Sequence, residues 1–470
     1  MRTRVFEYFH KVTAIPRGSG NTKKIADFLV EFAKTNSLKY IRDESDNVII
    51  FKDGMLGGEN KEPVILQGHT DMVCQQTADS KHDFSVSGPE IINDGDFLRA
   101  NKTTLGADNG IAVAIILAIL ESKDISHPPI EAVFTSDEEI GMVGASALDM
   151  TSLKSKIMIN IDSEEDDTVT VSCAGGNDIV MTLPLEKEEY VAREYNITFS
   201  GLQGGHSGVE IHKGRTNANV LAGRFLKHFS ENVEFRINGI NGGDKANAIC
   251  LECSFKLATN SDSFKEDAEA FLNQIKSEIS VKEPDFSFKI QENGKTKDAF
   301  SKLLCEKIIF LLTNAPDGVI EMSKEIEGLV ETSSNIGVLQ TRETEVFFDF
   351  SLRSNNASKL HDLEDRYIAL GKEAEAGVEK GSFYPPWEYL ANSKLEKIYT
   401  ECYRDFYGDK PKISAIHAGL ECGVFASKIE GLTAISIGPQ IYDVHTSNER
   451  LSISSTEKLT QLLIKVLKTL

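Results

Sequence analysis

Short, wholly apolar segments alternate with longer segments of helical periodicity in the first part of the chain. The apolar segments include "NVIIF" at 47–51, "PVILQG" at 63–68, "IEAVFTS" at 130–136 and "IMINID" at 157–162. Runs of this kind are typical of strands buried on both faces of a sheet, with helices as the connections between them. The pattern predicts an α/β domain whose mixed, mostly parallel sheet is covered by helices.

The pattern of apolar and polar positions changes between residues 185 and 385. Segments such as "REYNITFSG" at 193–201 and "EVFFDFSLRS" at 345–354 alternate apolar and polar positions, and amphipathic helical patterns lie between them. Such alternation predicts strands with only one face on a core. We therefore expect an inserted α+β domain over 185–385.

From residue 386 the chain again shows the pattern of its first part, with apolar strands and amphipathic helices. "LTAISIGP" at 432–439 resembles another buried strand, and 454–470 predict an amphipathic helix that opens with a capping box from Ser454 to Glu457. The expected organisation is thus one domain in two parts, residues 1–184 and 386–470, interrupted by the insertion.

Charge and composition narrow the function. The formal net charge is -21, from 72 acidic and 51 basic residues, which argues against nucleic acid and anionic membranes as partners. The longest apolar run, residues 110–120, is well short of the roughly 20 residues of a membrane span, and the N-terminus lacks a signal-peptide pattern. Seven scattered cysteines suggest reduced thiols. These features predict a soluble, cytoplasmic protein.

Histidines and acids follow several of the predicted strands, and one acid precedes the long apolar helix. In open α/β sheets ligands bind at the carboxyl ends of strands, so these side chains are expected to converge. Singly they have ordinary explanations as helix caps or solvated acids. The set comprises His69, Asp108, the run Asp137–Glu139, Asp162 and His445.

Clustered carboxylates repel one another unless a cation neutralises them. Two imidazoles with three carboxylates suit zinc, and the economical arrangement is a pair of metals that share one carboxylate and leave a bridging position for water. The residues by themselves therefore indicate a metal site.

Several motifs in this order resemble those of one enzyme family. They are "GHTDMV", "TTLGADNGIAVA", "SDEEIGMVGA", "INIDSEE", "GGHSG", "HAGLECGVF" and the closing pattern of a histidine followed by "ER". The chain is similar along nearly its whole length to the aminoacyl-histidine dipeptidases, also called peptidase D or cytosol non-specific dipeptidases. These belong to the di-zinc aminoacylase and carboxypeptidase-like clan of metallopeptidases. The resemblance implies a zinc-exopeptidase-like catalytic domain with an inserted lid.

The resemblance also implies the metal ligands. His69 and Asp162 would bind one zinc, Glu139 and His445 the other, and Asp108 would bridge them, with Mn²⁺ or Co²⁺ able to substitute for Zn²⁺.

Further residues receive catalytic roles from the same resemblance. Asp71 would orient the His69 ring, and Glu138 would be the general base that activates water. His206, in the lid, would stabilise the oxyanion.

Substrate contacts are implied at Asn247 and Arg353 in the lid, and near the substrate's ends at Gly419 and Glu421. The role of His417 stays open. The implied activity is hydrolysis of unblocked dipeptides, Xaa-His included, with small peptides as partners and a homodimer as one option. The alternatives are a related di-zinc amidohydrolase, such as an amino-acid deacylase or tripeptidase, and a non-catalytic zinc-binding protein.

Overall fold

The computed structural model describes the backbone of residues 1–470 and every side chain except that of Arg2. The described residues form two compact units. The first unit comprises 1–173, 387–415 and 420–470, and the second comprises 174–386 with the short segment 416–419. The expected boundary after residue 184 lies at the far end of the strand Gly175–Pro184, which belongs to the second unit.

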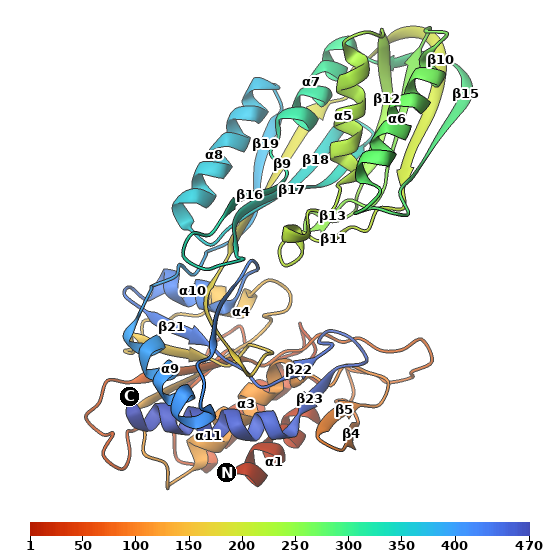
Figure 1. Cartoon of the computed structure of the whole chain (residues 1–470). Helices are drawn as coiled ribbons and strands as arrows, with labels where there is room; N and C mark the ends of the chain where they lie inside the picture. Colours follow the sequence, from red (N-terminus) through yellow and green to blue (C-terminus); the bar gives the residue numbers. More distant parts are fainter. The chain divides into compact units, whose positions relative to one another are not determined.

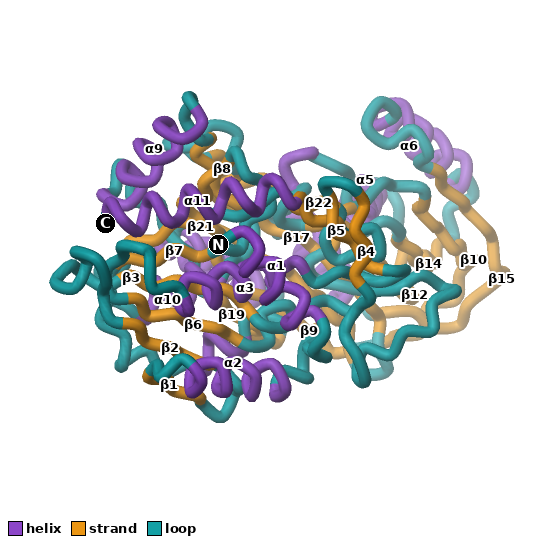
Figure 2. The backbone as a smooth tube through the Cα atoms, turned by 90° about the horizontal axis from the view of Figure 1, so that it is seen from below, coloured by secondary structure: helices purple, strands orange, loops and turns teal.

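The first unit is built on a mixed sheet with parallel strands at its centre, and Figure 2 labels the strands of this sheet from β1 to β8. In spatial order the strands are β1 (Lys39–Arg42), β2 (Val48–Lys52), β6 (Ile130–Thr135), β3 (Val64–His69), β7 (Ile157–Asn160), β21 (Thr433–Ser436), β8 (Thr168–Cys173) and β20 (Lys412–Ile416). Strands β6, β3, β7 and β21 pair in parallel, whereas β1, β2 and β8 pair antiparallel. This confirms the predicted fold class, with the parallel pairing confined to the centre.

Helices cover this sheet. They are α1 (Arg2–Thr13), α2 (Lys23–Thr35), α3 (Ala107–Glu121), α4 (Val143–Ala147), α9 (Lys394–Tyr407), α10 (Glu421–Lys428) and α11 (Ile453–Thr469). Helix α3 is buried almost all round because it packs between β3 and α1 (Figure 2), which explains its unbroken apolar sequence. The predicted capping box is wrong, because the side chain of Ser452 caps α11 while Ser454 donates to Asp96.

A small antiparallel sheet also belongs to the first unit. Its strands are β4 (Ile91–Asp94), β5 (Phe97–Ala100), β23 (Arg450–Ser452) and β22 (Ile441–Tyr442). It links the segment before α3 to the loop that carries His445 and Glu449, because β5 pairs with β23 in register. Two segments far apart in the sequence are thereby joined beside the start of α3.

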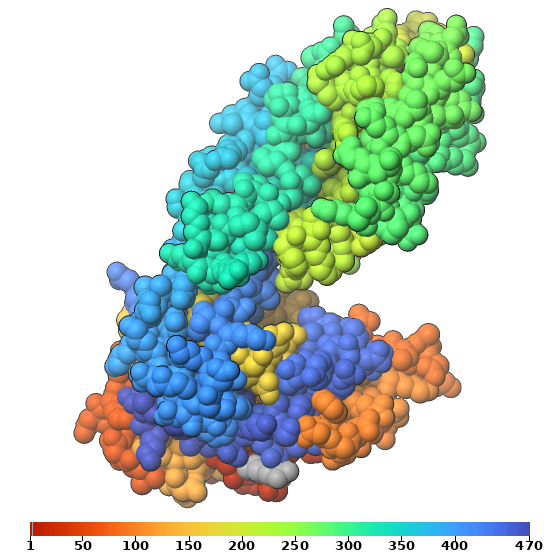
Figure 3. Space-filling model, viewed as in Figure 1, coloured from red at the N-terminus to blue at the C-terminus, as the bar shows by residue number. Residues whose placement is uncertain are grey.

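The second unit has an antiparallel sheet whose strands, in order, are β15 (Ser287–Phe300), β10 (Lys187–Ser200), β14 (Cys253–Thr259), β12 (Phe235–Gly242), β17 (Val330–Thr341), β18 (Glu345–Ser354), β9 (Gly175–Pro184) and β19 (Gly377–Tyr384), with β16 (Gly318–Met322) beside β17. Helices α5 (Ala218–Ser230), α6 (Phe264–Ile279), α7 (Lys302–Asn314) and α8 (Ala357–Glu373) lie on one face of this sheet (Figure 1), and they contribute to the surface of this unit in Figure 3. An aromatic-rich core fills the space between the layers. The α+β character predicted for the insertion follows from this one-sided cover.

Two sequence-based expectations concern thiols and membranes. Each cysteine among the described residues is a free thiol, and the exposed one is Cys74. No helix in the described part of the chain is long and apolar enough to cross a lipid bilayer.

Candidate metal centre

The parallel strands bring two of the predicted residues, His69 and Asp162, to one edge of the first unit's sheet. His69 ends β3 and lies opposite Thr135, the last residue of β6, while Asp162 follows β7 shortly after its end. A Cβ at Gly68 would collide with Oδ1 of Asn109, so a glycine there lets the start of α3 approach the end of β3. The strand pairing and this close approach together place His69 beside Asp108.

Two groups of ligand atoms meet at Asp108. Its Oδ1 lies 3.1 Å from Nε2 of His69, which is also 3.4 Å from Oδ1 of Asp162. Its Oδ2 lies 3.0 Å from Nε2 of His445, which is also 3.1 Å from Glu139. Each group could hold a metal ion, and Asp108 contributes one oxygen to each. A carboxylate shared between two possible ligand groups is therefore present at Asp108.

The electrostatics of this cluster call for a cation. Hydrogen bonds to Asp108 and Glu139 raise the pKa of His445 to about 11, and for His69 the carboxylates of Asp162 and Asp108 raise the pKa against the opposing effect of burial. Burial raises the pKa of Asp162 to about 6, with further contributions from Asp108 and Glu139. A strongly negative field that draws protons onto two imidazoles would equally favour divalent cations.

Asp71 organises the residues around the cluster. Its Oδ1 lies 3.2 Å from Nδ1 of His69 and accepts the amide N–H of Glu138 at 3.0 Å. Its Oδ2 accepts the Ser19 hydroxyl at 2.7 Å and the amide of Glu139 at 3.3 Å. Because Asp71 engages Nδ1, Nε2 of His69 is left for the cluster. One buried carboxylate thus contacts both the His69 ring and the loop that carries Glu138 and Glu139.

Glu138 is half-buried, and its carboxylate forms a third group of possible ligand atoms with His69 and Glu139. Burial raises the pKa of Glu138 well above its usual value, assisted by the negative charges of Asp162 and Glu421. Glu421 itself is fully buried, and its Oε2 accepts hydrogen bonds from Gln67 and from the Thr135 hydroxyl, the latter at 2.7 Å. Its side chain therefore supports the ends of β3 and β6.

In the second unit, His206 and Asn247 lie side by side. The short strands β11 (Gly205–His206) and β13 (Ala248–Ile249) pair so that His206 is opposite Ala248, and the Ser207 amide donates to the carbonyl of Asn247 at 2.9 Å. Nδ1 of His206 accepts the amides of Gly208 and Val209 at 3.0 and 3.2 Å. The ring's proton must then reside on Nε2, so His206 presents an N–H donor.

Arg353 belongs to a buried polar group in the same unit. Its guanidinium donates to the Tyr384 hydroxyl at 2.7 Å, and its positive charge helps to lower the pKa of both His206 and His417. Nε2 of His417 lies 2.7 Å from the Ser333 hydroxyl, and burial lowers the pKa of His417 to about 3. His417 and Gly419 lie in the segment 416–419, which packs with the second unit.

Sequence reasoning missed two residues beside the metal cluster. Arg17 is 1% exposed and donates to the carbonyls of Thr70 and Asp71. Glu449 is 2% exposed and accepts backbone amides at the start of α3. Glu449 lies in the "ER" pattern after His445, and this motif could have pointed to it. Arg17 is a single arginine in "IPRGSG", where neither periodicity nor composition distinguishes it.

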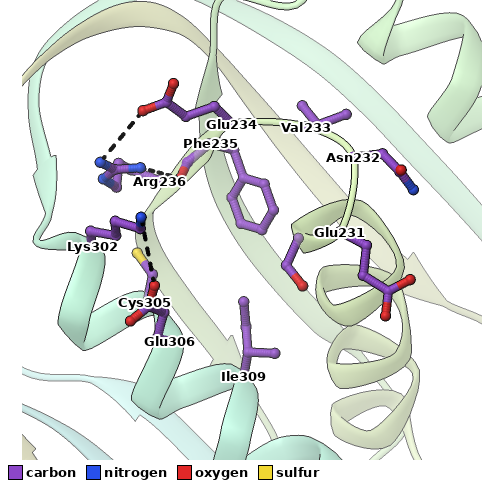
Figure 4. A pocket seen from close by; sticks show the side chains of 11 residues that line it. Glu231, Asn232, Val233, Glu234, Phe235, Arg236, Lys302, Cys305, Glu306 and Ile309 are labelled. Carbon is purple, nitrogen blue, oxygen red and sulfur yellow. Dashed lines mark hydrogen bonds and ion pairs between the residues drawn. The ribbon is translucent and has the colours of Figure 1, made fainter.

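A separate pocket in the second unit contains none of the predicted site residues (Figure 4). It lies between α5 and α7, and charged residues in its lining form ion pairs: Arg236 with Glu234, and Lys302 with Glu306. Cys305 also lines the pocket but is buried, and burial raises the pKa of its thiol to about 12. These features give the pocket no catalytic chemistry.

Comparison with known proteins gives concordant results. Residues 65–469 match peptidase family M20/M25/M40. The Escherichia coli protein named cytosol non-specific dipeptidase is 36% identical over 469 residues, which cover 99% of this chain and 97% of that protein.

Solved structures agree. The crystal structure of aminoacylhistidine dipeptidase from Vibrio alginolyticus aligns with a TM-score of 0.92 at 36% identity and covers 99% of this chain and 96% of that chain. A tripeptidase from Staphylococcus aureus aligns with a TM-score of 0.57 at 16% identity, covering 100% of this chain and 98% of that one, and so shares the fold.

Proposed function

Because the chain belongs to peptidase family M20/M25/M40, we propose that it is a cytoplasmic, metal-dependent dipeptidase that hydrolyses unblocked dipeptides, Xaa-His included. The observation that carries the proposal is the shared carboxylate of Asp108 between two histidines, each with a further acid. A purely structural zinc site would have no use for the additional, half-buried Glu138 beside these groups.

The donor set fits two divalent cations, which we take to be Zn²⁺. His69 and Asp162 would hold one ion, Glu139 and His445 the other, and Asp108 both. Imidazole and carboxylate are ligands that zinc prefers, and Asp71 leaves Nε2 of His69 available by engaging Nδ1. When bound, the two ions supply a water of lowered pKa and polarise the scissile carbonyl.

Glu138 would move the proton. Its carboxylate accepts a proton from the attacking water and delivers it to the leaving nitrogen, which would otherwise depart as an unstable amide anion. A raised pKa, caused first by burial, supports this role because a base that also acts as an acid works best with a pKa near the operating pH. The amide of Glu138, held by Asp71, limits the directions its side chain can take.

The second unit would act as the lid. His206 presents an N–H on Nε2, the donor that a developing oxyanion requires, and such a donor is worth about 3 kcal/mol of transition-state stabilisation. Asn247 is tied to the same loop through the Ser207 amide. Arg353 would bind the C-terminal carboxylate of the substrate, and the 416–419 segment, including Gly419, would lie near the substrate's ends.

Substrate length follows from such a clamp. An arginine fork that binds a terminal carboxylate measures the distance from that carboxylate to the scissile carbonyl. Dipeptides should therefore be cleaved and proteins should not. The resemblance implied a substrate contact at Glu421. Because this side chain is fully buried and accepts hydrogen bonds from Gln67 and Thr135, we propose instead that it supports the ends of β3 and β6.

The test is an assay of a small panel before and after removal of metal with a chelator. The panel contains several dipeptides with one Xaa-His member, a tripeptide and an N-acyl amino acid. We expect dipeptide cleavage that disappears on chelation and returns with Zn²⁺, Mn²⁺ or Co²⁺. Undiminished cleavage by metal-stripped protein would contradict the metal mechanism, and preference for the tripeptide or the N-acyl substrate would replace the dipeptidase assignment with one of the alternatives. Sedimentation analysis would distinguish a monomer from the homodimer that the sequence analysis gave as one option.

A further inference from the structure

Glu449 holds the backbone that carries the shared carboxylate. Its Oε2 accepts the amides of Leu105 and Gly106 at 2.7 and 2.9 Å, and its Oε1 accepts those of Ala107 and Asp108 at 2.7 and 3.3 Å. Both oxygens of this buried side chain are thus engaged by N–H donors. Glu449 is therefore a support for the Asp108 segment and is not a further metal ligand.

Arg17 holds the same segment from its other side. Its guanidinium donates to the carbonyl of Gly106, and also to the carbonyls of Thr70 and Asp71 at 3.0 and 2.9 Å. Thr70 directly follows His69. One fully buried cation therefore joins the loop after β3 to the loop before α3, and these two loops adjoin His69 and Asp108.

Gly106 makes this joint possible. It has a φ of +71°, a conformation that favours glycine, and a Cβ there would lie 2.5 Å from a guanidinium nitrogen of Arg17 and 2.7 Å from the sulfur of Met72. The amide of Gly106 donates to Glu449, and its carbonyl accepts a hydrogen bond from Arg17. The peptide groups on both sides of Gly106 are thereby fixed in direction.

We propose that Glu449 and Arg17 are positioning residues for the metal centre, which set the direction of the Asp108 carboxylate so that it can serve two ions at once. The inference rests on the proposed function. Asp108 must offer one oxygen toward His69 and the other toward His445, so a small rotation of its backbone would spoil both contacts. A shared ligand is the most demanding position in such a site.

Glu449 can be tested with a matched control. In Glu449→Gln one acceptor oxygen becomes an N–H₂ group that faces two amide donors, so two of the four backbone hydrogen bonds are lost. Glu131→Gln is the control, because Glu131 is also buried in the first unit and accepts amides of Lys154 and Ser155, but at the opposite end of β6 from the cluster. The two variants make the same chemical change at the two ends of the sheet.

Arg17 is tested by a conservative pair. Arg17→Lys keeps a charge and three donors that can reach backbone carbonyls, whereas Arg17→Met keeps only the bulk. If Arg17 acts through its hydrogen bonds, Lys should restore much of what Met loses.

The measurements are Zn²⁺ affinity by competition with a chromogenic chelator, the visible spectrum of the Co²⁺-substituted protein, and kcat and KM on a dipeptide. For Glu449→Gln and Arg17→Met we expect metal affinity to fall roughly 10- to 100-fold, the Co²⁺ bands to shift, and kcat to fall while KM changes little. Glu131→Gln should keep the wild-type affinity and spectrum, whatever it does to the melting temperature.

The outcomes separate this inference from the proposed function. If Glu449→Gln and Arg17→Met bind Zn²⁺ as tightly as the wild type and show its Co²⁺ spectrum, the positioning role is wrong although the dipeptidase stands. If Glu131→Gln loses as much metal affinity as Glu449→Gln, the effect is one of general stability, and the inference is again wrong. If the wild type itself binds no divalent ion, the proposed function fails first.

Discussion

Nδ1 of His69 lies 3.2 Å from Oδ1 of Asp71, and both side chains are buried. The same carboxylate accepts the amides of Glu138 and Glu139, so the ring and the acidic loop share one anchor. Oδ2 accepts two hydrogen bonds, and Oδ1 accepts one while it lies beside the His69 ring, so an asparagine, which has a single acceptor oxygen, could keep only part of these contacts.

Asp71→Asn should therefore weaken both metal binding and turnover. We expect losses of roughly 10- to 100-fold in each, the range typical of residues that orient metal ligands. Zinc competition and dipeptide kinetics would measure them. Ser19→Ala, which removes a single donor to Asp71, should have a much smaller effect. Equal metal affinity in Asp71→Asn and the wild type would contradict the orienting role.

Glu138→Gln and Glu139→Gln should fail in different ways. The first should retain both metals and lose turnover by orders of magnitude, because a base contributes to the transition state and not to ligation. The second should lose metal, since Glu139 lies 3.1 Å from the His445 nitrogen that would bind the same ion. Metal analysis beside kinetics distinguishes the two, and the reverse pattern would exchange the two assignments.

The preference for dipeptides with a free C-terminal carboxylate over their C-terminal amides should depend on Arg353. The wild type is expected to cleave a dipeptide much faster than its C-terminal amide, and Arg353→Ala should lose most of that ratio while keeping its metals. Comparable cleavage of both substrates by the wild type would refute the carboxylate clamp and leave the metal chemistry intact. The ratio of kcat/KM for the two substrates is the measurement.

Tyr384→Phe offers a milder version of the same test. The Tyr384 hydroxyl accepts a hydrogen bond from Arg353 at 2.7 Å, and its loss should let the guanidinium swing. We expect a raised KM for the free dipeptide with little change for the amide. A rise in KM for both substrates alike would argue that Tyr384 supports the fold instead of the clamp.

The stability of the second unit should fall as the pH rises through the range in which the carboxyl group of Asp317 loses its proton. Burial raises the pKa of Asp317 to about 6, so the folded state holds its proton more tightly than the unfolded state. The stabilisation is full below the unfolded pKa of about 4 and is lost by pH values above 6, a difference of about 3 kcal/mol.

Asp317→Asn should flatten that dependence. Oδ1 of Asp317 accepts both the Ile336 amide and the Asn217 side chain, and an asparagine oxygen can do the same. Melting temperature measured from pH 4 to 8 should thus fall less with pH in the variant and should be higher than wild type at pH 7. An unchanged slope would show that Asp317 is not the group responsible.

Sequence periodicity located the elements that carry the site. Apolar runs ending in His69 and shortly before Asp162 could be recognised as core strands because burial on both faces leaves no polar positions within them. The fold class and the family were predicted on this basis and from ordered motifs, and both are confirmed. The roles of the individual site residues stay predictions.

Other features could not be predicted because nothing local encodes them. Glu449 and Arg17 act on backbone groups of distant loops, and any residue can supply a backbone amide or carbonyl, so the partner's sequence carries no mark of the contact. The cap of α11 was misplaced for a related reason: Ser452 and Ser454 have the same chemistry, and tertiary contact with Asp96 decides between them.

By itself the sequence determined the strands, the helices and the residue types that end them, because those follow from local periodicity and burial. Only the tertiary structure decided that Asp108 faces both His69, 39 positions away, and His445, 337 positions away. Parallel pairing of β3, β6 and β7 aligns their ends, and the β5–β23 pairing brings the His445 loop to the start of α3. Hydrogen bonds between strands, which depend little on side-chain identity, set these distances.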